Sequence, residues 1–324
     1  MLLLGLSATF LTVLVLFIEF LRHRTRPLPT RGWIGLISLL TAEWLLFRGF
    51  MPIAIYFTPI AWTSYILLAD AAVLAITGHS RLHEDPKHCA HVALLSIPLW
   101  LIFEAYNLRL ANWTYIGVPT YWALELLGYG WSFATITPAI FESADLIEAF
   151  GWFRPAQPWI FSRAVQRAMV VFGALCLILP LLLPRSTAAR LFALVWVGFI
   201  FLLDPINYRL QLPSILGDFA LGRRGRFYSL LIAGWVCGIL WEFWNYWAAA
   251  KWLYIFPMFQ QWKIFEMPLP GYLGFLPFAV ECFVMYVTAS WLLGFRYHLT
   301  SSDVNFSAKG SRSLQSSQDP SVET

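Results

Sequence analysis

Long apolar blocks alternate with short polar segments along the 324 residues of the chain. A helix needs about 20 mostly apolar residues to cross the hydrocarbon core of a bilayer, and about nine blocks approach or reach that length. They lie near residues 2–21, 33–50, 54–77, 91–110, 121–143, 165–183, 188–207, 227–249 and 270–294. The pattern therefore predicts an all-α fold, a polytopic bundle of about nine membrane-spanning helices.

Three segments need a separate interpretation. The block 33–50 holds Glu43 and Arg48, so it could be a re-entrant or interfacial segment. The block 2–21 lacks the basic start and small-residue cleavage site of a signal peptide, and we expect it to be a retained helix. The segment 296–324 is polar and rich in serine, and we expect a disordered cytoplasmic tail.

Arginine and lysine divide unequally between the two sides that alternating spans create. One side holds 16 of them and the other holds 6. By the positive-inside rule, the first side is cytoplasmic, the N-terminus lies outside and the C-terminus lies inside. The chain is expected to be a multi-pass protein of the bacterial inner membrane.

Composition supports the membrane interpretation and excludes other classes. The chain is 59% hydrophobic and 12% charged, whereas soluble domains carry about 25% charged residues. We attribute the net charge of +4 to loop arginines rather than to nucleic-acid binding, so a membrane lipid is the expected partner. The 4 cysteines form no CxxC pair, which argues against a zinc ribbon or a disulfide framework.

Polar residues recur in the same order in two parts of the chain. The first copy contains Trp62, Asp70, Glu104, Asn107, Trp113, Tyr115, Glu125, Pro138 and Glu142, and the second contains Trp196, Asp204, Glu242, Asn245, Trp252, Tyr254, Glu266, Pro277 and Glu281. The matched helices run in the same direction, which predicts a parallel internal repeat. The units expected are N-terminal span(s) (1–53), the first copy (54–147), a linker with a connecting span (148–190), the second copy (191–295) and the tail (296–324).

Carboxyl groups within the spans are the candidates for chemistry. Glu242 and Asn245 lie three residues apart on one helix face, and Glu104 and Asn107 repeat this spacing. An asparagine amide can donate a hydrogen bond to the neighbouring carboxyl group and orient it. An apolar setting favours the protonated form of such a group, which makes it a candidate proton donor.

A second cluster follows in the chain, where prolines and glycines interrupt the helix before Glu281. Irregular backbone at membrane depth is expected only where it is buried or lines a cavity. Glu142 is the counterpart of Glu281 in the first copy. Aromatic faces stabilise cations, and we expect substrate contacts from a further set of residues, although packing or interfacial belts are an open alternative for the tryptophans. That set is Trp241, Trp244, Tyr254, Glu266, Asp204 and Asp70.

Histidines gather in one predicted cytoplasmic loop, at His79, His83, His88 and His91. Pairs at these spacings could bind a metal ion. The remaining histidines, His23 and His298, are remote in sequence, and a solvated loop is the interpretation we adopt. We expect neither a metal nor a cofactor.

The motifs of the second copy resemble the lycopene cyclase domain family, the membrane type of bacteria and fungi with duplicated three-helix units. The resemblance covers roughly residues 60–145 and 195–290 and is carried by Trp241-Glu242, Trp252-Leu253-Tyr254 and the segment from Gly274 through Pro277 to Phe283. The chain departs from the family where paired acids are expected, because Ala279 and Val280 stand there and Glu281 follows one residue later.

This resemblance implies proton-initiated, redox-neutral chemistry on an isoprenoid chain without a cofactor. One carboxylic acid protonates an alkene, aromatic faces support the cation, and a second carboxylate removes a proton. By position, the resemblance assigns these roles to Glu242 and Glu281, with Glu104 and Glu142 as counterparts. Two other classes remain open: a transporter or channel, and a structural membrane protein. A narrow apolar slot open to lipid favours the enzyme, a water path to both sides favours transport, and the absence of a cavity favours a structural role.

Overall fold

The computed structural model describes residues 1–295 and consists mainly of helices. Seven of the described helical segments are long and apolar enough to cross a membrane. They are α1 (Leu2–His23), α4 (Phe57–Thr77), α6 (Pro86–Leu110), α8 (Arg163–Leu182), α10 (Phe192–Arg209), α12 (Gly225–Trp247) and the segment Leu269–Leu292, which contains α13 (Tyr272–Leu292). The protein is therefore a helical, membrane-embedded protein.

Two further long helices fall outside this set. Helix α2 (Thr30–Phe47) has 18 residues, and helix α7 (Trp122–Ala149) has 28. At about 1.5 Å per residue, α2 measures about 27 Å, so its length alone would nearly span the hydrocarbon core. Both helices contain carboxylates and other polar residues that lower their hydropathy. The total of about nine spans remains a prediction, as does the predicted tail, which lies outside the described residues.

The order of elements from α2 to α7 recurs from α8 to α13. Short helices separate the long ones at matching places, and one strand precedes the last long helix of each part. The short elements are α3 (Met51–Ile55), α5 (Arg81–Glu84), β1 (Trp113–Ile116), α9 (Arg185–Ala188), α11 (Ile215–Ala220) and β2 (Lys251–Tyr254). The second part alone adds β3 (Lys263–Ile264), β4 (Met267–Pro268) and the 3-10 turn η1 (Leu269–Gly271) before α13.

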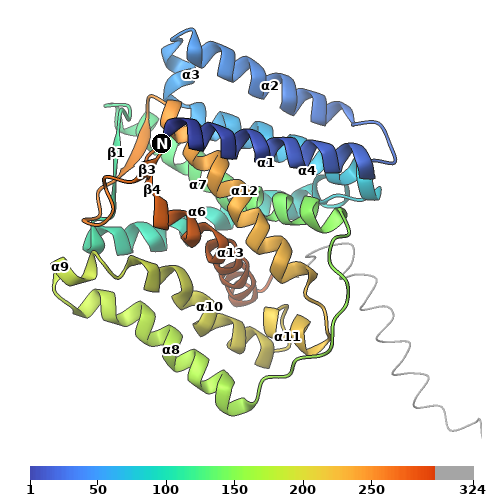
Figure 1. Ribbon diagram of the computed structural model, residues 1–324, viewed down its shortest axis with the longest axis vertical. Coiled ribbons are helices and arrows are strands. Elements are labelled where there is room, and N and C mark those ends of the chain that lie inside the picture. Colours follow the sequence, from blue (N-terminus) through green and yellow to red (C-terminus); the bar gives the residue numbers. More distant parts are fainter. Residues whose placement is uncertain (296–324) are drawn as a thin grey trace, which may run out of the picture.

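Helix packing follows the same recurrence. Helix α2 packs on α4, which packs on α7, and α8 packs on α10, which packs on α13. In Figure 1, α2 and α8 lie at opposite edges, with α6, α7, α12 and α13 between them. The recurring order thus begins one helix earlier, at α2 and α8, than the units predicted from residues 54 and 191.

Glycines allow the closest approaches between these helices. A Cβ atom added at Gly35 would lie 2.6 Å from the Ser64 carbonyl oxygen of α4, and one at Gly234 would lie 2.1 Å from the Phe275 carbonyl oxygen of α13. Small residues let helix backbones come together where lipid provides no hydrophobic drive for association. The α2–α4 and α12–α13 pairs therefore depend on these residues having no side chain.

A serine from a neighbouring helix stabilises an irregular turn of α7. The Ser96 hydroxyl of α6 donates to the Phe133 carbonyl at 2.5 Å and accepts from the Thr137 amide at 3.0 Å. Pro138 follows directly and has no amide hydrogen to donate. Ser96 thus supplies hydrogen bonds where the α7 backbone is interrupted, as a buried membrane helix requires.

Candidate active site

The two Trp-x-Tyr segments lie against each other. Strands β1 and β2 pair antiparallel, with Trp113 opposite Tyr254 and Tyr115 opposite Trp252. Figure 1 shows the strands gathered at one end of the helix bundle. This register gives the two motifs equivalent positions about the centre of the strand pair.

Matching asparagines hold both strands on their helices. The Asn107 amide nitrogen donates to the Trp113 carbonyl at 2.9 Å, and Asn245 donates to the Trp252 carbonyl at 2.9 Å. Each asparagine oxygen accepts in return from the backbone amide of the same tryptophan, at 3.1 Å and 3.0 Å. The prediction that these amides orient the neighbouring glutamates is therefore wrong. Their polar atoms are engaged by strand backbone that would otherwise lack partners.

Matching tyrosines contact the two glutamates instead. The Tyr254 hydroxyl donates to Glu242 Oε1 at 3.0 Å, and the Tyr115 hydroxyl donates to Glu104 Oε1 at 2.5 Å. Burial raises the pKa of both tyrosines well above the usual value, and the adjacent carboxyl group raises it further. Both phenols therefore keep their protons at physiological pH.

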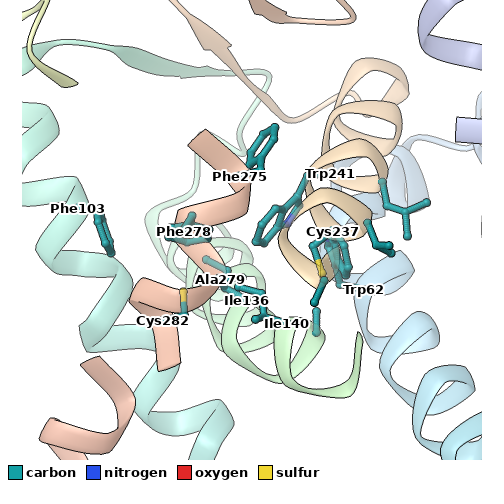
Figure 2. Packing of buried hydrophobic residues seen from close by; sticks show 14 of the residues in the cluster. Trp62, Phe103, Ile136, Ile140, Cys237, Trp241, Phe275, Phe278, Ala279 and Cys282 are labelled. Atoms are coloured by element: carbon teal, nitrogen blue, oxygen red, sulfur yellow. The ribbon is translucent and has the colours of Figure 1, made fainter. Parts of the chain in front are cut away.

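An aromatic cavity of about 120 Å³ opens beside the strands, with Tyr115 and Tyr254 in its wall. Most of the wall is aromatic, and Glu125 and Lys251 are its only charged residues among those described. The aromatic lining consists of Tyr56, Trp62, Trp100, Trp113, Tyr115, Tyr129, Phe133, Trp196, Trp241, Trp252, Tyr254, Phe275 and Phe278. Figure 2 shows Trp241 with Phe275 and Phe278, whose ring centres lie 6.2 and 5.8 Å from that of Trp241.

The predicted catalytic glutamates lie behind this wall or beyond it. Glu242 contacts the cavity wall through Tyr254, and Glu104 contacts it through Tyr115, Trp100 and Trp113. Glu281 is fully buried and accepts a hydrogen bond from the Phe199 amide of α10 at 3.3 Å. Glu142 is also buried, and neither it nor Glu281 lines the cavity. The structure therefore separates the four carboxyl groups into two near the strands and two deeper in the bundle.

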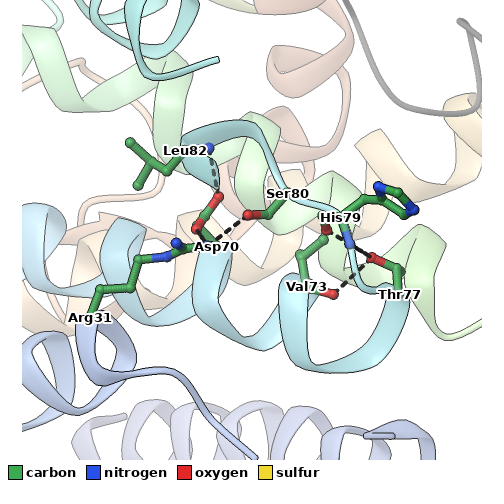
Figure 3. A network of polar contacts seen from close by, with 7 residues as sticks. All are labelled: Arg31, Asp70, Val73, Thr77, His79, Ser80 and Leu82. Carbon is green, nitrogen blue, oxygen red and sulfur yellow. Dashed lines mark hydrogen bonds and ion pairs between the residues drawn. The ribbon is translucent and has the colours of Figure 1, made fainter. Parts of the chain in front are cut away.

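The two predicted aspartates have a different environment. Asp204 accepts from the amides of Ile215 and Leu216 at 2.7 and 2.9 Å, at the start of α11. Asp70 accepts from the Leu82 amide of α5 at 2.9 Å and pairs with Arg31 at 2.6 Å, as Figure 3 shows. Neither aspartate lines the cavity, so they serve as anchors for the short helices rather than as the substrate contacts that we predicted.

The remaining predicted contacts divide between the wall and its surroundings. Trp241 and Tyr254 line the cavity, and their role as substrate contacts stays a prediction. Trp244 instead packs behind Trp62, with ring centres 4.9 Å apart, and donates to Glu43 at 3.2 Å. Glu266 pairs with Lys251 at 3.2 Å and does not line the cavity.

Two cavity residues could have been found from the repeat but were not assigned. Trp62 and Trp196 occupy matching places eight residues before Asp70 and Asp204, and both line the cavity. A large aromatic side chain retained at the same place in both copies was the available signal. Trp100, Phe275 and Phe278 lack such a match, and only the packing of several helices brings them to the wall.

A packed layer lies at the inner end of the cavity. On α12, Trp241 lines the cavity, Cys237 is fully buried, and Leu230 lines a second, smaller hollow. Two other helices show the same order. On α7, Ile136 lines the cavity, Ile140 is buried and Ala144 lines the hollow. On α13, the corresponding residues are Phe278, Ala279 and Phe283. The cavity and the hollow therefore lie toward opposite ends of the same helices, with these buried residues between them.

The histidines of the predicted loop make separate contacts. His88 Nε2 lies 2.8 Å from the Tyr286 hydroxyl, and His79 pairs with Glu84. Within residues 1–295, no group of three or more histidine, cysteine, aspartate or glutamate side chains is arranged to hold a metal ion. These contacts assign the two histidines to local polar networks.

Comparisons with protein-family models, with curated proteins and with solved structures found no match to this chain.

Proposed function

We propose that this protein is a membrane enzyme that carries out redox-neutral, proton-initiated chemistry on an isoprenoid or carotenoid-like lipid. The reaction would be a cyclisation, an isomerisation or a hydration. The observation that supports this proposal best is the aromatic cavity, whose wall contains two tyrosines that each bind a glutamate.

The lining of the cavity fits an apolar substrate that passes through a cation. Ligand sites are mostly apolar with a few placed polar groups, and this wall fits that description. Aromatic faces attract cations, with an energy of about 2 kcal/mol or more for each contact when water is excluded. A carbocation formed in the cavity would meet such faces, among them Trp62, Trp241 and Trp100.

The tyrosines offer a proton at the same wall. Tyr254 lines the cavity and contacts Glu242, whose side chain is fully buried. A carboxyl group that hydrogen-bonds to a neutral phenol can replace the proton that the phenol gives away. Protonation of an alkene followed by loss of a proton needs no oxidant, so the proposed chemistry is redox-neutral.

We infer that the recurring order of elements reflects a parallel duplication, with about nine spans in total. The matched hydrogen bonds of Asn107 and Asn245 support this inference, since the same contacts occur at both places. We further propose that the strand end faces outside and that the N-terminus lies outside and the C-terminus inside, in a bacterial inner membrane. The unequal division of arginine and lysine supports that orientation.

Turnover in heavy water would test the proposal. Purified protein in lipid nanodiscs would be incubated in D₂O with acyclic isoprenoid lipids, and the extracts would be analysed by mass spectrometry. We expect a product that carries deuterium on carbon. Glu43→Gln is the matched control, because Glu43 is a carboxyl group of a membrane helix that does not contact a cavity tyrosine.

Two outcomes would contradict the proposal that the protein is an enzyme. If no lipid gains deuterium while proteoliposomes move a small solute, the transport interpretation replaces it. The two hollows at opposite ends of the same helices would then be the two sides of a closed transporter. If neither conversion nor flux is found, the polar contacts have a structural role only.

A further inference from the structure

We propose that the two glutamate–tyrosine pairs have different functions: Tyr254 and Glu242 transfer the proton, whereas Glu104 stays ionised and stabilises the cation. This proposal rests on the proposed function and assigns roles within the same site. It follows from the different numbers of hydrogen-bond donors around the two carboxyl groups.

Glu104 is surrounded by donors. Its Oε1 accepts from Trp100 Nε1 at 2.8 Å, from Trp113 Nε1 at 3.2 Å and from the Tyr115 hydroxyl at 2.5 Å. The two indoles are donors only, and an ionised carboxylate is an acceptor only, so this arrangement suits the charged form.

Glu242 accepts one hydrogen bond of normal length, from Tyr254, with the Trp252 side chain and the Met267 amide also near its carboxyl group, and it has no exposure. Its Oε1 accepts from Tyr254 at 3.0 Å, its Oε2 has no hydrogen-bond partner, and the residue is 0% exposed. An ionised carboxylate with one unpaired oxygen would cost several kcal/mol in such a place. A protonated carboxyl group requires fewer donors and brings a donor of its own. The geometry therefore suits the proton-carrying form.

Two changes in sequence produce this difference. Four residues before Glu104 stands Trp100, whereas four residues before Glu242 stands Gly238. A Cβ atom added at Gly238 would lie 2.2 Å from the Phe275 ring, so that ring takes the space of the missing side chain.

The second change concerns the strand tryptophans. Trp113 donates to Glu104 itself, whereas the matching Trp252 donates to the Tyr254 hydroxyl at 3.0 Å. The Trp252 indole N–H thereby orients the Tyr254 hydroxyl oxygen. The Tyr254 hydroxyl therefore contacts both the Trp252 indole and the Glu242 carboxyl group.

The proposed step balances in protons and electrons. The substrate alkene takes the Tyr254 proton, so that a C–H bond forms as the O–H bond breaks, and the Glu242 carboxyl proton replaces it on the tyrosine oxygen. The products are a carbocation and the Glu242 carboxylate. After the carbon skeleton rearranges, the cation loses a proton to Tyr254 as Tyr254 returns its own to Glu242. Substrate and product are isomers, and both residues regain their starting state. The Glu104 charge, facing the cavity through Tyr115 and Trp113, lowers the energy of the cation throughout.

Infrared difference spectra would test the assignment without any substrate. The Glu242→Gln change is expected to remove a carboxylic acid C=O band, and Glu104→Gln is expected to remove a carboxylate band. Both substitutions preserve size and one acceptor oxygen, and the Glu43→Gln spectrum serves as a comparison for a carboxyl group outside the site. The reverse assignment of bands, or loss of the same kind of band in both variants, would overturn the proposal.

Kinetics would test the roles. Tyr254→Phe and Glu242→Gln are expected to lower deuterium incorporation by about 10²–10⁴-fold, as loss of a general acid does. Glu104→Gln is expected to slow turnover by about 10²–10³-fold while the solvent isotope effect on turnover persists, because proton transfer remains intact. Glu242→Gln with undiminished deuterium incorporation would refute the relay. If the infrared result is as expected but no lipid is converted, the proposed function fails while the protonation assignment stands.

Discussion

Replacing Gly234 with alanine should weaken the contact between α12 and α13. The added Cβ would lie 2.1 Å from the Phe275 carbonyl oxygen, 2.9 Å from its carbonyl carbon and 3.1 Å from the Leu276 Cα. All three are backbone atoms, so no side chain can rotate away. The two helices must separate locally, and overpacking of this kind costs about 1–3 kcal/mol.

The matched control is Gly130→Ala on α7. No atom lies within 4 Å of the position that its Cβ would take, and Gly130 is in the interior of a helix. Alanine there should stabilise the helix by about 0.5–1 kcal/mol, because it restricts the unfolded chain. The two variants introduce the same methyl group and are expected to change stability in opposite directions.

Thermal unfolding in detergent, followed by tryptophan fluorescence, measures this difference. A change of 1 kcal/mol moves the midpoint by about 2–4 °C in chains of about 200 residues, so Gly234→Ala should unfold several degrees below the wild type. Because Phe275 also lines the cavity, the same variant should lose turnover at temperatures where it remains folded. A Gly234→Ala midpoint at or above that of Gly130→Ala would refute the close approach of the two helices.

Three further predictions concern the site. Glu242→Gln should unfold within about 1 kcal/mol of the wild type, because the amide still accepts from Tyr254, and a large loss of stability in the same fluorescence assay would argue against this contact. Asn245→Ala should cost about 1–3 kcal/mol, since it leaves backbone groups of β2 without partners; an unchanged midpoint would show that the strand is held in another way. Cysteines introduced at Thr114 and Leu253, which face each other across β1 and β2, should form a disulfide under mild oxidation. After the chain is cleaved between the two positions, this disulfide would be visible as a gel shift. The control pair, with cysteines at Ile116 and Leu253, is offset by two residues and should form a disulfide much less readily.

The sequence was informative where a polar residue stands in an apolar background. Glu242 and Tyr254 could be selected because a carboxyl group and a Trp-x-Tyr motif recur at matching places, and the structure brings these two residues into contact. Helices long and apolar enough to span a membrane could be predicted because hydropathy over about 20 residues is a local property.

The hydrogen-bond partners of the polar residues could not be predicted in the same way. Spacing along a helix shows which side chains share a face, but it says nothing about the chain beyond the helix end. Asn245 was expected to bind Glu242 and instead binds the backbone of β2, which follows the helix. Asp204 likewise holds the start of α11, a contact that depends on how the next loop folds back.

The cavity could not be predicted from the sequence for a related reason. Its wall combines side chains from several helices and both strands of the β1–β2 pair, and no single periodic pattern marks residues that converge only after packing. Trp100 and Trp244 are both tryptophans of membrane helices, yet the first lines the cavity and the second packs behind it.

The packed layer at Cys237, Ile140 and Ala279 also has a consequence for how a lipid would be supplied. If a lipid entered near the strand end, these buried residues would separate it from the smaller hollow toward the other end of the helices. Substrate would be drawn from one leaflet of the bilayer, and product would return to that leaflet. Any lipid made on the opposite face would have to cross the membrane first, so the rate of lipid flip-flop, rather than that of the chemical step, would set the supply to this protein.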